Sequence, residues 1–194
     1  ILSAAHVLYK EGTSEQFKEC VFRPQNMRLT SIGFYGLSDH RFIPSVEDKL
    51  LLSNNDLVFI ALKRKLPHEG MALGLASSVY KSLQLVGYNE DKNDISISSA
   101  CQTFSSVAFY SDKLLLHDCD AGSGASGGPI IDQISKEIIA VHGGTFYVDG
   151  KAHSQVFKTY PTAHPESLIN QGRKIDEEVI VDLAGFILSL STDS

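Results

Sequence analysis

A single serine stands among glycines in the stretch Gly124-Ala125-Ser126-Gly127-Gly128-Pro129. Glycine adopts backbone conformations closed to other residues, so this loop can expose a serine hydroxyl and leave neighbouring N–H groups unpaired. A nucleophile beside two free N–H donors is the arrangement that acyl transfer needs. The alternative is a surface turn rich in glycine and serine, which is the commoner origin of an isolated Gly-x-Ser-x-Gly match.

A serine nucleophile needs an adjacent base, usually a histidine held by a carboxylate. Among the seven histidines, only His6 ends a stretch of small residues, Ser3-Ala4-Ala5-His6, where the alanines let neighbouring backbone approach closely. Asp56 opens the apolar run 57–62, so burial would leave its carboxylate in need of a partner. Taken singly, His6 is more simply a strand-end histidine and Asp56 a turn residue. Taken with Ser126, they form an ordered set.

Short strands separated by turns must position these residues. Apolar or alternating runs predict strands at 1–9, 27–35, 57–62, 82–87, 95–103, 107–110, 114–117, 129–131 and 137–141. Asp149-Gly150 predicts a two-residue hairpin between 145–148 and 152–157. Apolar residues between 179 and 190 recur at helical spacing, and Asp176 can cap the first turn. The pattern therefore predicts an all-β barrel or sandwich with one C-terminal helix packed on it.

Composition narrows the class of protein. The 194 residues are 43% hydrophobic and 21% charged, which is typical of a globular chain that forms one domain or two small halves. The formal net charge is −6 and there is no basic run, so a nucleic-acid partner is not expected. No apolar stretch is long enough to span a bilayer, since 179–190 is short and carries Asp182. The polar segment 63–70 is the expected linker between two halves.

The three cysteines, Cys20, Cys101 and Cys119, cannot all pair within one chain. Cys101 and Cys119 lie close enough in sequence to close a short loop between neighbouring strands. Buried reduced thiols explain the count equally well, so it leaves both interpretations open.

The order of the three candidate residues distinguishes hydrolase families. His6, Asp56 and Ser126 run histidine, acid, serine, whereas α/β-hydrolases run serine, acid, histidine. The literal Gly-x-Ser-x-Gly also fits an α/β-hydrolase nucleophile elbow, which requires a helix directly after the serine. Here the strand-like 129–131 follows instead, and the chain lacks alternating helices.

The motifs resemble those of the chymotrypsin-like serine peptidases. Residues 3–6 resemble the Thr-Ala-Ala-His motif of that family, 55–62 its Asp-Ile-Ala-Leu strand, and 124–129 its Gly-Asp-Ser-Gly-Gly-Pro. Residues 117–121 and Val141-His142-Gly143-Gly144 are similar to segments of the bacterial branch that includes the V8-like glutamyl endopeptidases. The resemblance spans nearly the whole chain.

The resemblance implies two six-stranded antiparallel β-barrels with a C-terminal helix. Residues 1–66 would form the N-terminal barrel and carry the histidine and aspartate, and residues 67–194 would form the C-terminal barrel with the nucleophile loop. The family has two strands before the histidine motif, and this sequence lacks them. We therefore expect an N-terminal barrel without its first strands, and a further N-terminal segment as a partner.

The resemblance also assigns roles. Ser126 would attack the substrate carbonyl, His6 would take its proton and return it to the leaving amine, and Asp56 would hold the imidazole tautomer. The N–H groups of Gly124 and Ser126 would form the oxyanion hole. Protein or peptide substrates are expected, with no metal and no other cofactor. The alternative is a low-turnover binding or regulatory protein on the same fold, against which the complete triad argues.

The S1 residues implied by the resemblance are Asp120, Ala121, His142, Gly143 and Gly144. Trypsin-like enzymes bind arginine or lysine through an aspartate at the position of Asp120, whereas the V8-like branch binds glutamate with help from a histidine matching His142. This chain keeps the histidine but has Ala121 in place of a threonine. A carboxylate buried without a cation is costly, so we expect a basic or small P1 residue rather than glutamate.

The resemblance further implies a Cys101–Cys119 disulfide just upstream of the glycine loop. Cys20 would be free or paired with the N-terminal segment. A disulfide indicates an oxidising compartment, so a secreted or periplasmic location is expected.

Overall fold

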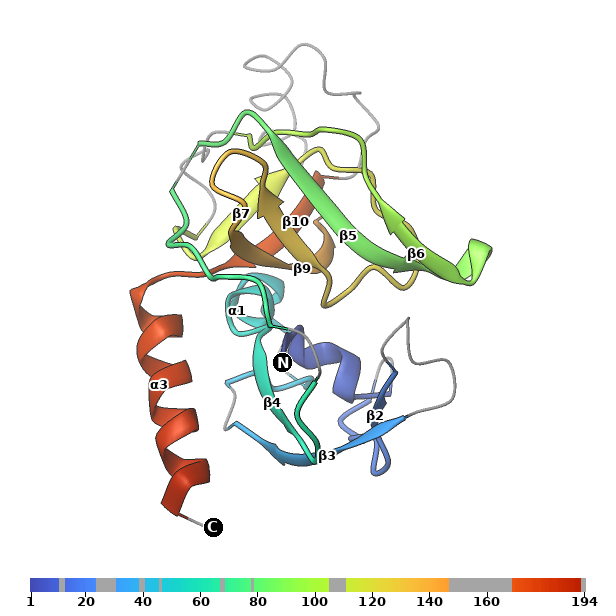
Figure 1. Cartoon of the computed structure of the whole chain (residues 1–194). Coiled ribbons are helices and arrows are strands. Elements are labelled where there is room, and N and C mark those ends of the chain that lie inside the picture. The colour runs from blue at the N-terminus through green and yellow to red at the C-terminus, as the bar shows by residue number, and fades with distance from the viewer. Residues whose placement is uncertain are drawn as a thin grey trace.

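The computed structural model describes residues 1–10, 13–23, 31–38, 41–45, 47–66, 69–77, 79–104, 111–146 and 169–192. Two antiparallel sheets lie one above the other, and a long helix runs along one side of the lower sheet (Figure 1). The predicted strand at 107–110 and the predicted hairpin turn at Asp149-Gly150 lie outside the described residues. Among those described, no helix is both long enough and apolar enough to cross a membrane.

The first sheet has the strand order β1-β4-β3-β2. Its strands are β1 (Leu2–Ser3), β2 (Val21–Phe22), β3 (Ile32–Leu37) and β4 (Val58–Leu62). The apolar run predicted as a buried strand is β4, where Val58, Phe59 and Ile60 are all buried. The described strands of this half pair antiparallel, as expected for a chymotrypsin-like barrel.

The second sheet has the strand order β6-β5-β8-β9-β10-β7. Its strands are β5 (Leu83–Asn89), β6 (Asp94–Ile97), β7 (Leu114–His117), β8 (Pro129–Asp132), β9 (Ile138–Phe146) and β10 (Ile169–Lys174). The six strands expected of the second barrel are confirmed. Its core is a cluster of buried side chains from neighbouring strands: Leu83, Leu85, Leu115, Ile130, Ile139 and Ala140, with both disulfide cysteines and Ala125.

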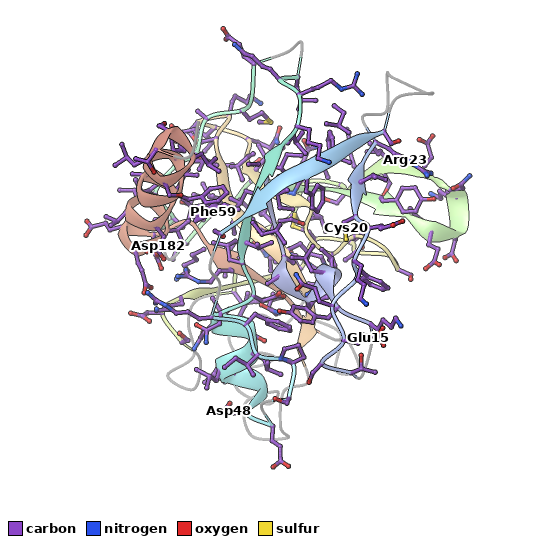
Figure 2. All side chains as sticks on the ribbon, turned by 90° about the horizontal axis from the view of Figure 1, so that it is seen from below. Glu15, Cys20, Arg23, Asp48, Phe59 and Asp182 are labelled. Atoms are coloured by element: carbon purple, nitrogen blue, oxygen red, sulfur yellow. A yellow bond between two sulfur atoms is a disulfide. The ribbon has the colours of Figure 1, made fainter. Side chains whose placement is uncertain are left out.

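The predicted C-terminal helix is confirmed as α3 (Glu177–Thr192). Asp176 caps it, because its Oδ1 accepts a hydrogen bond from Val179 N at 3.0 Å. Phe186 stacks on Phe59 with ring centroids 6.0 Å apart, and Figure 2 shows Phe59 between β4 and the helix. A buried cluster joins Phe59 of the first sheet, Val141 of the second and Val179 of the helix. The helix therefore packs where the two sheets meet.

One local prediction is wrong, and one short helix was not predicted. The strand predicted over 1–9 ends at Ser3, and Ala5–Leu8 form a 3₁₀ turn instead. The small side chains of Ala4 and Ala5 are fully buried. Because they are small, the backbone of the turn can lie close to the backbone of neighbouring segments. Lys49–Asn54 form the short helix α1, which no pattern indicated, and Asp48 caps it by accepting from Leu50 N and Leu51 N. A second 3₁₀ turn, Glu90–Lys92, follows β5.

Candidate active site

The pairing of β1 with β4 brings His6 and Asp56 together. Ser3 lies opposite Val58 in this ladder, so the turn after β1 passes the residues that precede β4. The backbone N–H of His6 donates to Asp56 Oδ1 at 2.8 Å, and His6 Nδ1 lies 2.7 Å from Asp56 Oδ2. Asp56 is 4% exposed, whereas the His6 side chain is 35% exposed. A buried carboxylate thus holds the backbone N–H of His6 through one oxygen and its solvent-facing imidazole through the other.

The bond between His6 Nδ1 and Asp56 Oδ2 decides which ring nitrogen of His6 carries the proton. An ionised carboxylate only accepts hydrogen bonds, so Nδ1 must carry the proton and Nε2 keeps its lone pair. Burial lowers the pKa of His6. The hydrogen bond to Asp56 and the charge of that carboxylate raise it by more, so the pKa of His6 is above the ordinary 6.5. A neutral imidazole with an exposed lone pair is a general base.

The Ser126 loop is held by backbone bonds to the second sheet. Gly127 N donates to His142 O at 2.8 Å, and His142 N donates to Gly128 O at 2.8 Å. Gly127 has a φ of +82°, which L side chains rarely adopt. A Cβ at Gly128 would lie 2.3 Å from Val86 O, so only glycine fits against β5. The loop needs glycine at 127 for its positive φ and at 128 for the close approach of β5. Ser126 lies half-buried at this turn.

Two N–H groups of the loop are available to a ligand. Within the described part of the chain, neither Gly124 N nor Ser126 N donates to a backbone carbonyl, whereas Ala125 N between them donates to Gly122 O at 3.2 Å. Gly124 has a φ of +90°, a conformation that re-aims the peptide bonds on either side of it. Two free N–H donors, one of them the serine's own, could together bind an oxyanion at this turn.

The loop contacts the first sheet next to the histidine turn. A Cβ at Gly127 would lie 2.4 Å from Ser3 Oγ and 3.3 Å from Ala4 N, so the glycine packs directly on the strand that leads into His6. On the other side, a Cβ at Gly143 would lie 3.2 Å from Asp56 Oδ2. The serine loop and β9 of the second sheet therefore meet the histidine and aspartate of the first.

The expected S1 residues occupy different environments. His142 is 3% exposed, and Gly143 lies against Asp56. Gly144 has a φ of +142°, and a Cβ there would meet no atom within 4 Å. Asp120 is exposed and Ala121 is partly buried beside the second core. The structure thus brings His142 and Gly143 to the candidate triad and leaves the Asp120 carboxylate in contact with solvent.

Sequence reasoning placed His117 in a motif but gave it no role. It is fully buried, and its Nε2 lies 3.4 Å from His142 Nδ1. Its Nδ1 accepts from Cys119 N at 3.2 Å, so its proton sits on Nε2 and points at His142. Burial lowers the pKa of His117 to about 3 and that of His142 to about 4, so both rings are neutral at pH 7.

Gln171 is a further residue that sequence reasoning missed. It is 5% exposed in β10, and its Nε2 lies 2.7 Å from the point that a Cβ of Gly143 would occupy. A single glutamine in a strand carries no sequence signal, and only the pairing of β9 with β10 brings it to the site.

A disulfide joins Cys101 and Cys119, 18 residues apart, as the resemblance implies. Cys119 is fully buried in the second core and Cys20 is a half-buried free thiol. The described residues contain no cluster of three or more histidine, cysteine, aspartate or glutamate side chains able to hold a metal ion.

No protein-family model and no curated protein sequence matches the chain. Solved structures match it along most of its length. A Glu endopeptidase is 16% identical, with a TM-score of 0.60 over 94% of this chain and 78% of the other. The protease Anisep from Arthrobacter nicotinovorans is 14% identical, with a TM-score of 0.60 over 89% and 76%. The thermostable serine protease AL20 from an extremophilic microorganism is 12% identical, with a TM-score of 0.64 over 93% and 81%. At these identities the likeness shows a common fold.

Proposed function

We infer from its chymotrypsin-like double-barrel fold that the chain is a serine endopeptidase of protein or peptide substrates. The observation that carries this inference is the pair of bonds from His6 to the buried Asp56 carboxylate, at 2.8 and 2.7 Å. In a Ser-His-Asp triad, the buried acid binds one ring nitrogen of the histidine, and the other ring nitrogen is left to act as the base. The proposed nucleophile is Ser126, on the loop that packs against Ser3 through Gly127.

The proposed reaction proceeds through an acyl-enzyme. His6 Nε2 takes the proton of the Ser126 hydroxyl as the oxygen attacks the scissile carbonyl carbon. The Asp56 carboxylate stabilises the imidazolium that results, because its charge and hydrogen bond raise the pKa of His6. The tetrahedral intermediate collapses as His6 gives its proton to the leaving amine. Water then repeats the sequence to release the acid.

Gly124 N and Ser126 N supply the proposed oxyanion hole. Both are unpaired with backbone carbonyls in the described residues and flank an N–H that is paired. Donors fixed by a loop need no reorganisation when the oxyanion forms, and each is worth about 2.7–4 kcal/mol in comparable sites. The β9–loop bonds at His142 hold the two donors in place.

For the P1 residue we retain a basic or small side chain over glutamate. His142 has a pKa of about 4 because it is buried and lies near His6, so at neutral pH it offers no positive charge to a glutamate. The exposed Asp120 carboxylate supplies negative charge on the same segment that leads to Ser126. Cleavage profiling on a peptide library tests this preference. Dominant cleavage after glutamate that is lost in His142→Ala would contradict it.

We also assign residues 1–66 to the first barrel and residues 67–194 to the second. The Cys101–Cys119 disulfide supports a secreted or periplasmic location, because such bonds persist in oxidising compartments.

A fluorophosphonate probe tests the catalytic proposal. It phosphonylates a serine only where a base activates the hydroxyl, so wild type is expected to label and Ser126→Ala is expected not to. Ser123→Ala is the matched control, because Ser123 lies in the same loop but its exposed hydroxyl donates to Glu90 Oε2 at 2.6 Å. Wild-type protein that neither labels nor cleaves peptides would instead indicate a binding protein on this fold.

A further inference from the structure

Gln171 is a buried amide at an irregular point in the pairing of β9 with β10. It pairs with Gly144 of β9, but the next residue, Gly172, pairs with His142, so Gly143 is left between them as the extra residue. Such a bulge locally bends a strand and changes where its neighbours point. The Gln171 side chain and the Asp56 carboxylate both lie next to the bulged Gly143.

The glycine at 143 opens a space that Gln171 and Asp56 share. The point where a Cβ would stand lies 2.7 Å from Gln171 Nε2 and 3.2 Å from Asp56 Oδ2. Both polar atoms therefore border one small volume, and the structure has no hydrogen bond between them across it. Any larger residue at 143 would separate the amide from the carboxylate.

The hydrogen-bonding capacity of the two groups is complementary. Each carboxylate oxygen accepts two hydrogen bonds, and Asp56 Oδ2 already accepts one from His6 Nδ1. Gln171 Nε2 carries two N–H donors. The reverse orientation of the amide would point its carbonyl oxygen at a carboxylate, which is repulsive, so the orientation with Nε2 at the acid is the favoured one.

The amide is expensive to keep for structural reasons alone. Among the described residues, Gln171 Oε1 finds no hydrogen-bond partner although it is buried. A buried polar atom without a partner costs about 1–3 kcal/mol, and an apolar side chain of similar volume would avoid that cost. A glutamine kept here at a cost to folding calls for a role in the site.

We propose that Gln171 is a positioning residue of the catalytic site, whose side-chain amide turns across this shared space to donate an N–H to Asp56 Oδ2 and fixes the rotation of that carboxylate toward His6. This proposal rests on the proposed function, because it assigns Gln171 to the triad inferred above. Asp56 is then held from three sides: by the backbone N–H of His6, by the His6 ring and by the amide. Gln171 touches no reacting atom.

The first test is Gln171→Leu, which removes the donors and keeps the volume. Loss of one hydrogen bond to a charged group predicts a fall in kcat of about tenfold to 150-fold, with KM unchanged. The midpoint of thermal unfolding is expected to stay the same or to rise, because the orphaned oxygen is removed as well. Gln84→Leu is the matched control, since Gln84 is half-buried in β5 of the same sheet and makes only a 3.5 Å bond to Ser98 O.

The second test is a rescue. Gln171→Ala empties the shared space, and Gly143→Ser then places a hydroxyl next to Asp56 Oδ2. The double variant is expected to recover most of the kcat lost in Gln171→Ala. Gly143→Ser alone is expected to lower kcat, because its Cβ would meet Gln171 Nε2 at 2.7 Å. If Gln171 only filled space, a serine at position 143 on the neighbouring strand would not restore the kcat lost in Gln171→Ala.

The third test does not depend on activity. The side-chain amide signals of Gln171, assigned by NMR from their loss in Gln171→Leu, are expected to move upfield in Asp56→Asn, while those of Gln84 stay in place. An unchanged Gln171 signal, or a Gln171→Leu variant with wild-type kcat, overturns the positioning role. If wild type takes up no fluorophosphonate, the proposed function fails, and the NMR result still decides whether the amide contacts the acid.

Discussion

Asp56→Asn is the sharpest perturbation of the site, because the two bonds of Asp56 make different demands on its replacement. The backbone N–H of His6 donates to Oδ1 and cannot accept, so the asparagine oxygen must stay at that position. The asparagine NH₂ then replaces Oδ2, where it faces His6 Nδ1. Nδ1 is forced to accept, and the imidazole proton moves to Nε2. The ring then presents a proton rather than a lone pair to Ser126.

The size of the loss separates two effects. If Asp56 only orients the ring, the variant loses one charge-assisted hydrogen bond, worth about 1.5–3 kcal/mol, and kcat falls by about tenfold to 150-fold. If Asp56 sets the tautomer, the base is absent in almost every molecule and kcat falls by about 10⁴-fold. The geometry predicts the larger loss.

Steady-state kinetics on an ester substrate, with protein concentration fixed by absorbance, measures this loss. Asp48→Asn is the matched control: Asp48 is an exposed acid that caps α1, and asparagine caps a helix about as well. Its kcat is expected to equal that of wild type. An Asp56→Asn variant that loses less than a factor of ten would refute the tautomer argument and remove Asp56 from the triad.

Three further predictions concern stability, pH and the serine loop. Reducing the disulfide, whose cysteines are 18 residues apart, is expected to cost about 3 kcal/mol and lower the unfolding midpoint by about 6–12 °C; calorimetry with and without reductant measures this, and a change under 2 °C would contradict it. Because the pKa of His6 is raised, kcat/KM is expected to fall with decreasing pH at a midpoint above 6.5, and a measured midpoint below 6.5 would be inconsistent with the His6–Asp56 pairing. The contribution of this pair to stability is full below pH 6.5 and is lost as the pH rises through the raised pKa. Gly128→Ala is expected to abolish fluorophosphonate labelling, because its Cβ would meet backbone at 2.3 Å, whereas Gly122→Ala meets only a flexible asparagine side chain and should label; equal labelling of both variants would show that the loop is not pinned.

Much of the strand arrangement could be predicted because burial leaves a periodic pattern. The continuous apolar run of β4 and the helical spacing of α3 each report one environment along the whole element. The turn that carries His6 could not be predicted from the same signal, since Ala5 and Leu8 are buried in a 3₁₀ turn as well as they would be in a strand. Short elements bury too few residues to reveal their period.

The site divides in the same way. His6, Asp56 and Ser126 could be proposed from the sequence because nucleophilic chemistry restricts residue type, and glycines around the serine restrict the backbone. Gln171 was not identifiable, since its place depends on a bulge between β9 and β10. A one-residue change in register would turn its side chain to the other face of the sheet. Register is a property of two segments distant in sequence, which one segment's pattern does not encode.

Helix α3 bears on how the protein would be switched off. The base and the acid of the proposed triad come from one sheet and the serine from the other, and the cluster of Phe59, Val141 and Val179 joins the two sheets beneath the helix. Apart from Val179, the side chains of the helix are at least partly exposed, so its hold on the sheets is local. Release of this one helix would remove that apolar contact between the two halves and leave the packing of Gly127 on Ser3 and the hydrogen bond from Arg173 Nε to Asn54 O to hold them together. The proposed activity would then be lost on heating or in mild denaturant before the β structure is lost. Detachment of α3 would be the local unfolding step that separates the serine from its base while the sheets stay folded.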